Sequence, residues 1–135
     1  MGKVSLKKLE DFELQRIYDF FEDEHINYTF ANDYRSRLAC SLIAFIVEKD
    51  EEEVGFINFV YEELNNSYNI DLGILDKYRG LGYGSQATKL LKEIIQDCNY
   101  DLSIQAEEEN YAANRILEKN GFSYVKRLGN INYYK

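Results

Sequence analysis

The chain has 135 residues, 45% of them hydrophobic, which predicts a single domain spanning residues 1–135 and excludes disorder along the whole chain. Its 24 acidic residues oppose 16 Lys and Arg residues, and the net charge of −8 excludes a nonspecific nucleic-acid binder, which needs a basic surface. No apolar run approaches the ~18 residues of a membrane span and the N-terminus lacks the apolar block of a signal peptide, so we expect a cytoplasmic protein with no membrane partner.

The first half of the chain predicts strands interrupted by one helical region. In order, we expect a strand at 4–6, a helix at 11–21, a helical or irregular stretch at 26–38, and strands at 42–48 and 54–61. The acidic run at 50–53 falls between the last two and predicts a solvated hairpin turn.

The second half alternates between strands and helices. In order, we expect a strand at 68–75, a helix at 85–97, a strand at 102–106, a helix at 110–120, and a hairpin of strands at 122–125 and 131–134. A helix between two strands implies a parallel crossover. We therefore predict an α/β (mixed α+β) fold, with six to seven strands in a mostly antiparallel sheet, one central parallel pair and about four helices.

Cysteine and histidine are too few and too scattered for a metal centre. Cys40 and Cys98 lie far apart in the sequence, and His25 is the only histidine. No zinc-site spacing results, so we expect no metal and two reduced, half-buried thiols.

A glycine-rich loop, Arg79-Gly80-Leu81-Gly82-Tyr83-Gly84, connects the strand at 68–75 to the next helix. Amides at a helix N-terminus bind anions, and glycine lets the backbone approach a phosphate closely. The loop has no Walker pattern, and Ser85 stands where a dinucleotide fingerprint needs glycine. A simple tight turn and a nucleotide-binding module are the alternative interpretations of this loop.

The loop also resembles the [RQ]-x-x-G-x-[GA] signature of the GNAT superfamily of acyl-CoA N-acetyltransferases. A second string, NYAANRILEKNGF over residues 110–122, resembles the other signature of that family. One helix and one strand separate the two signatures, as in the family. Within it, the string NRILEKNGF is most similar to the ribosomal-protein N-terminal acetyltransferase branch, which is RimJ/RimL-like.

This resemblance implies acetyl-CoA as cosubstrate and a central strand pair that splays apart. The backbone of the glycine loop would bind the pyrophosphate, through Arg79, Gly80, Leu81, Gly82, Tyr83, Gly84 and Ser85. The strand edge at Gly73, Ile74 and Leu75 would pair with the pantetheine arm, and an amide at Ile74 or Leu75 would stabilise the developing oxyanion. Asn110 would contact the pantetheine arm or support the wall of the gap between the two strands that the arm enters.

The resemblance implies an N-acetyltransferase acting directly on a primary amine, either a small cationic molecule or a peptide N-terminus. Asp71 is the candidate general base, with an edge or surface carboxylate as the alternative, and the triplet at 107–109 is either a second candidate or a solvated turn. Leu117 occupies the position where many members carry a Tyr general acid. A CoA-binding regulatory or interaction protein is therefore the alternative function, and both a monomer and a homodimer are open.

Overall fold

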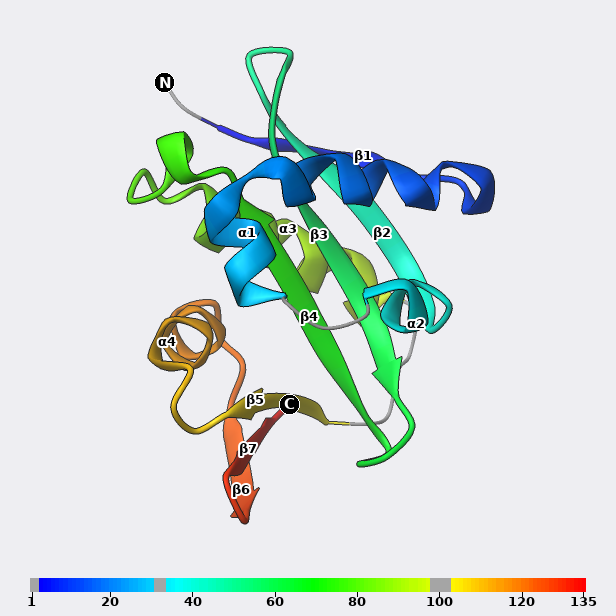
Figure 1. Ribbon diagram of the computed structural model, residues 1–135. Coiled ribbons are helices and arrows are strands. Elements are labelled where there is room, and N and C mark those ends of the chain that lie inside the picture. The colour runs from blue at the N-terminus through cyan, green and yellow to red at the C-terminus, as the bar shows by residue number, and fades with distance from the viewer. Residues whose placement is uncertain (1–2, 31–33, 98–102) are drawn as a thin grey trace.

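Alternating apolar residues build one sheet, seen in the computed structural model, which describes residues 3–30, 34–97 and 103–135 (Figure 1). Within those residues the sheet has seven strands in the order β1-β2-β3-β4-β5-β7-β6. The strands are β1 (Ser5–Lys8), β2 (Ser41–Lys49), β3 (Glu52–Glu62), β4 (Ser67–Ile74), β5 (Ile104–Glu107), β6 (Tyr124–Leu128) and β7 (Ile131–Tyr134). Among the described strands, only β4 and β5 pair in parallel, which confirms the predicted mixed, mostly antiparallel sheet.

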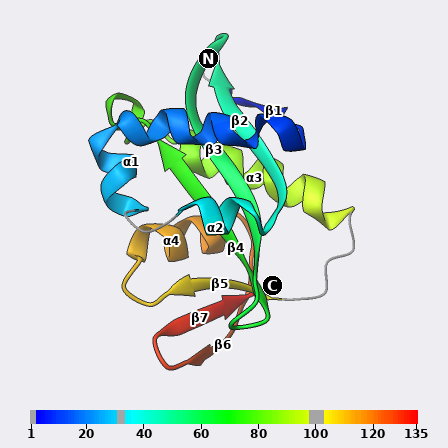
Figure 2. The same cartoon turned by 45° about the vertical axis from the view of Figure 1, so that its right-hand side comes forward.

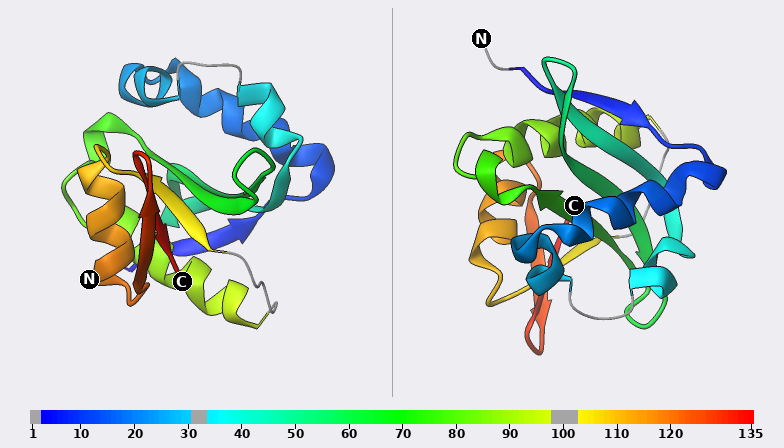
Figure 3. Two further views of the ribbon diagram at one scale, coloured as in Figure 1. Left: turned by 90° about the horizontal axis from the view of Figure 1, so that it is seen from below. Right: turned by 45° about the horizontal axis from the view of Figure 1, so that its top comes forward.

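Helices cover both faces of the sheet (Figure 3). One face carries the amphipathic helices α3 (Tyr83–Gln96) and α4 (Tyr111–Lys119), while the other carries η1 (Asp11–Glu22), α1 (Glu24–Thr29) and α2 (Tyr34–Leu38). Neighbouring residues of β3 point to opposite faces: Ile57 packs in the α3 core and Phe56 in the core beneath η1. Both faces of the central strands are therefore buried.

The N-terminal helical region differs in type from its sequence pattern. The predicted helix at 11–21 is the 3₁₀ helix η1, and its inward-facing residues Leu14, Ile17 and Phe20 repeat every third position, as a helix of three residues per turn requires. Phe12, which the pattern assigned to the apolar set, is 80% exposed. The ambiguous stretch at 26–38 contains parts of α1 and all of α2, and residues 31–33 lie outside the described part.

The remaining predicted elements shift by a few residues. The first strand is Ser5–Lys8 rather than 4–6, and the strand expected at 122–125 is β6. The strand expected at 102–106 is β5, Ile104–Glu107, and residue 102 lies outside the described part. The hairpin turn expected at 50–53 is confirmed at Asp50 and Glu51, which have positive φ, whereas Glu52 and Glu53 already belong to β3. Cys40 is free and exposed rather than half-buried, and Cys98 is not among the described residues.

None of the helices in the described residues is long and apolar enough to cross a membrane.

The central parallel pair diverges almost as soon as it forms (Figures 1 and 2). β4 pairs with β3 along its whole length, from Ser67 to Ile74. Within the described residues, it pairs with β5 at a single position, Tyr68 opposite Ile104. The predicted splayed strand pair is therefore present, and the second half of β4 presents an edge that β5 does not cover.

Candidate active site

The start of α3 is built to present backbone amides. Gly80 and Gly82 adopt φ values of +78° and +84°, a left-handed conformation that glycine reaches without steric cost. Gly82 is the N-cap of α3 and makes no side-chain capping bond, and the first turn of the helix holds no acidic residue. A Cβ added at either glycine would meet no atom within 4 Å of the described structure. This open, positively polarised helix end fits a phosphate group.

A cationic side chain stands at the entrance of the same loop. The Arg79 side chain is 53% exposed and forms an ion pair with Asp76 at 3.2 Å. Exposed pairs of this kind contribute little stability, so the guanidinium is free to exchange Asp76 for an anionic ligand. The loop residues Arg79–Ser85 predicted from the sequence therefore share one surface around the start of α3.

The exposed edge of β4 begins beside this loop. A Cβ on Gly84 would lie 2.8 Å from Leu72 Cδ2, so the first turn of α3 packs directly on β4. An extended ligand held by its phosphates at α3 would therefore reach the β4 edge without leaving the protein surface.

Strand geometry decides which amides that edge offers. The Leu75 amide donates to the Val54 carbonyl at 2.9 Å, so it belongs to the β3–β4 ladder. The Tyr68 amide donates to the Ser103 carbonyl at 2.9 Å on the opposite side. Because amides alternate along a strand, the Ile74 amide points the same way as that of Tyr68, toward the diverging β5. Of the two amides expected from the sequence, Ile74 is the one placed to meet a ligand.

Asn110 begins α4 as its N-cap. Its Oδ1 accepts a hydrogen bond from the Ala113 amide at 3.1 Å, which confirms the predicted cap. Leu117, further along α4, is 4% exposed and packs in the core shared with α3. That position holds a packing residue and supplies no proton donor.

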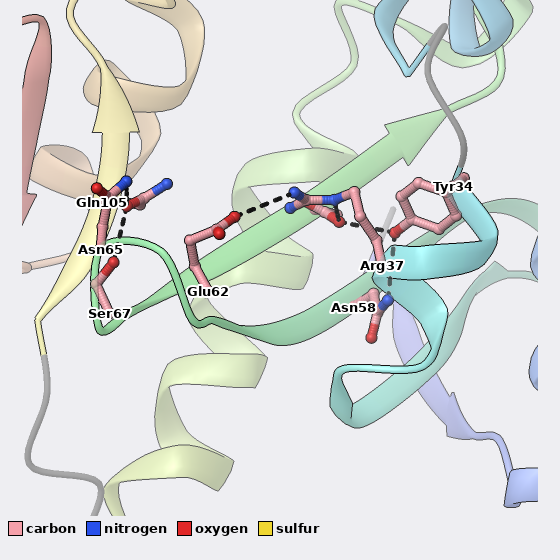
Figure 4. A network of polar contacts seen from close by, with 8 residues as sticks. Tyr34, Arg37, Asn58, Glu62, Asn65, Ser67 and Gln105 are labelled. Carbon is pink, nitrogen blue, oxygen red and sulfur yellow. Dashed lines mark hydrogen bonds and ion pairs between the residues drawn. The ribbon is translucent and has the colours of Figure 1, made fainter.

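Asp71 is buried in a polar network that the sequence did not reveal. Its partners Tyr34 and Arg37 are labelled in Figure 4. Tyr34 Oη donates to its Oδ2 at 2.8 Å, and Arg37 donates from Nε to Oδ2 at 2.8 Å and from Nη2 to Oδ1 at 2.5 Å. Burial, and then the charge of Asp71, raise the pKa of Tyr34 well above its ordinary value. Burial opposes the charge of Arg37, but its hydrogen bonds and Coulombic attraction to Asp71 together raise the pKa of Arg37. The interpretation of Asp71 as an edge or surface carboxylate is therefore wrong.

The acidic triplet at 107–109 is exposed, and Glu108 forms an ion pair with Arg127 at 3.1 Å. Of the two interpretations of this triplet, a second candidate base or a solvated turn, the exposed position supports the solvated turn.

Residues 5–123 match the family described as an acetyltransferase (GNAT) domain. The chain belongs to the GNAT acetyltransferase family. A search of curated proteins by sequence gives no match. The family match over residues 5–123 confirms the resemblance that the glycine loop and the string at 110–122 indicated.

Solved GNAT structures share the fold at low sequence identity. RimL, a ribosomal L7/L12 α-N-protein acetyltransferase in complex with coenzyme A, has a TM-score of 0.67 and 13% identity, covering 99% of this chain and 93% of its own. The microcin C7 self-immunity acetyltransferase MccE, in complex with acetyl-CoA and AMP, has a TM-score of 0.64 and 14% identity, with coverages of 99% and 92%. The aminoglycoside acetyltransferase AAC(6')-Ib, in complex with coenzyme A, has a TM-score of 0.66 and 21% identity, with coverages of 98% and 92%.

Proposed function

We propose that this GNAT protein transfers an acetyl group from acetyl-CoA to a primary amine, either on a cationic small molecule or at a protein N-terminus. The observation that carries the proposal is the uncapped start of α3 lying against the part of β4 that β5 does not cover. An anion site joined to an open strand edge suits a ligand with a diphosphate at one end and amide groups along its arm. RimL, MccE and AAC(6')-Ib, which were solved in complex with coenzyme A or acetyl-CoA, support the same ligand.

Each group of residues has a distinct task in this proposal. The amides of residues 80–85 and the Arg79 guanidinium would hold the pyrophosphate, and Asn110 would support the wall formed by α4. The β4 edge at Ile74 would align the pantetheine arm, whereas Gly73, two residues before Leu75, faces β3. When bound, acetyl-CoA supplies an acyl group that is already activated as a thioester. The Ile74 amide would stabilise negative charge on its carbonyl, and most of the acceleration would come from holding the two substrates together.

Acidic side chains near the end of β4 support a cationic acceptor. An open surface pocket where α1 meets η2 (Asp76–Tyr78) is lined by Glu22, Asp23, Glu24, His25 and Asp76. The net charge of −8 adds a long-range attraction for cations.

A release assay for free CoA over a panel of primary amines tests the proposal. We expect amine-dependent release, and thermal stabilisation by acetyl-CoA but not by ATP or NAD. Stabilisation by ATP or NAD alone would instead identify a nucleotide-binding module. Saturable CoA binding without turnover on any amine would identify the regulatory protein that Leu117 suggested.

A further inference from the structure

We propose that Asp71 is a positioning residue rather than the general base, and that with Tyr34 and Arg37 it forms a clasp that holds α2 beside the diverging β4 and β5. This inference rests on the proposed function, because it assigns α2 to the acceptor side of that active site. The side chains of Asp71, Tyr34 and Arg37 together form this Asp71 clasp.

The clasp occupies both oxygens of the carboxylate. Arg37 binds it through two nitrogens, and the buried Tyr34 hydroxyl adds a third donor at 2.8 Å. Asn58 in turn donates to Tyr34 Oη at 3.2 Å and accepts from Ser41 Oγ, so the network continues into β3 and β2. Within the described residues, no buried side-chain nitrogen or oxygen lacks a partner. A carboxylate so fully engaged is poorly placed to accept a proton from an amine.

Removing the Asp71 carboxylate would also remove the charge that faces Arg37. The Arg37 side chain is 31% exposed, and its second partner, Glu62, lies 3.6 Å from Nη1. Breaking one member of such a buried pair leaves the other charge without compensation, which is strongly destabilising. The contacts of the carboxylate with Arg37 and Tyr34 therefore indicate a structural task.

The location of the clasp connects it to the acceptor. Asp71 lies on the face of β4 that α2 covers, whereas Leu72 faces α3, where the phosphates are proposed to bind. In the amide orientation that satisfies both of its groups, Asn69 accepts from Arg37 Nη2 at 3.3 Å and donates to the Gln105 carbonyl at 3.2 Å. Gln105 is next to the Tyr68–Ile104 contact, where β4 and β5 separate. The clasp thus fixes α2 on the side of the opening opposite the phosphate loop, from which the acceptor would approach.

The experiment compares Asp71→Asn and Tyr34→Phe with two matched controls. Asp50→Asn changes an exposed hairpin carboxylate, and Tyr61→Phe removes a hydroxyl that bonds to Asn66 outside the clasp. Hydrogen exchange of the amides in Tyr34–Leu38, acetyl-CoA affinity by calorimetry, and acceptor kcat and KM against pH are measured for each protein. Tyr34→Phe keeps the ion pair, so it remains informative if Asp71→Asn fails to fold.

For Asp71→Asn we expect exchange in α2 to accelerate by about tenfold or more, because the variant weakens a buried charged pair. Acetyl-CoA affinity should stay near the wild-type value, acceptor KM should rise more than kcat falls, and the midpoint of the pH profile should not move. Tyr34→Phe should show the same pattern with smaller changes, and both controls should match the wild type.

Two results would overturn the clasp. One is unchanged exchange in α2 in both variants. The other is a loss of kcat of ~10²–10⁴ with disappearance of the acidic limb of the profile, as removal of a general base produces. If the wild-type protein binds no acetyl-CoA, the proposed function fails instead, and the exchange measurement still decides whether the clasp holds α2.

Discussion

Gly82 and Gly129 have similar backbone conformations in different surroundings, so they form a matched pair of positions. Their φ values are +84° and +60°, and a Cβ at either would meet no atom within 4 Å of the described structure. Replacing each by Val should cost about 1–2 kcal/mol or more of stability, because an L side chain is strained in this region. Only Gly82→Val should also weaken acetyl-CoA binding, since Gly82 caps α3 whereas Gly129 turns the β6–β7 hairpin. Calorimetric titration and urea unfolding of both variants test this, and equal affinities would remove the loop from the binding site.

Asn114 makes four hydrogen bonds from a buried position on α4. Its Nδ2 donates to the carbonyls of Glu107 at 2.9 Å and Asn110 at 2.8 Å. Its Oδ1 accepts from Asn132 Nδ2 at 3.0 Å and Tyr134 Oη at 2.6 Å. Asn114→Ala should destabilise the protein by about 2–4 kcal/mol, because it removes all four of these hydrogen bonds.

Urea unfolding measures this loss for Asn114→Ala. The control is Asn27→Ala on the exposed side of α1, which should change stability by less than about 0.5 kcal/mol. Equal effects of the two substitutions would show that the Asn114 hydrogen bonds contribute nothing to stability.

At the level of elements, Asp23 joins α1 to the end of β4. Its Oδ1 accepts from the Ile26 amide at 3.2 Å as the N-cap of α1, and its Oδ2 accepts from the Asp76 amide at 3.0 Å. Desolvation acts to raise the pKa of Asp23, but the backbone amides of Asp76, Ile26 and His25 together lower it. A carboxyl whose pKa is lowered in the folded state stabilises the fold at pH values above its pKa in the unfolded chain, ~3.9. That contribution is lost as the pH falls through the lower pKa of the folded state.

Asp23→Ala should therefore reduce stability by about 1 kcal/mol at pH 7, the typical contribution of an N-cap. The difference from wild type should shrink as the pH is lowered from 7 to 2, because protonation of the wild-type carboxyl removes the contribution of its charged form. Urea unfolding at the two pH values measures it, with Asp19→Ala on the exposed side of η1 as the control. A difference that is constant between the two pH values would contradict the role of the charged form.

Periodic elements were predictable from the sequence, and short or register-dependent features were not. The strand at 131–134 and the amphipathic helices α3 and α4 appear within about two residues of their predicted ends, because their apolar spacing records one buried face. α2 has five residues, too few to show a period, and this is why Tyr34 and Arg37 carried no signal. Their partner Asp71 is 34 to 37 positions away, and only tertiary structure brings the three together.

The candidate site divides in the same way. The glycine loop was predictable because its chemistry lies in consecutive residues. The choice between the Ile74 and Leu75 amides depends on the register of β4 with β3, which composition does not encode. Gly84 likewise packs against Leu72, so Gly84→Val would disturb the sheet as well as the loop.

At the scale of the whole molecule, the negative net charge predicts that added salt changes kcat/KM in opposite directions for a cationic and an anionic acceptor. The chain carries −8 overall, and acidic side chains line the pocket beside the end of β4. At about 10 mM salt the Debye length is about 30 Å, so this negative field acts on an approaching substrate, whereas at about 0.3 M salt the field is largely screened.

For two acceptor peptides that differ only in Lys against Glu, added salt should lower kcat/KM for the Lys peptide by about tenfold and raise it for the Glu peptide. Steady-state kinetics at saturating acetyl-CoA measures both, which separates the acceptor from effects of salt on the anionic cosubstrate. Equal salt responses of the two peptides would show that the acceptor side does not select for positive charge.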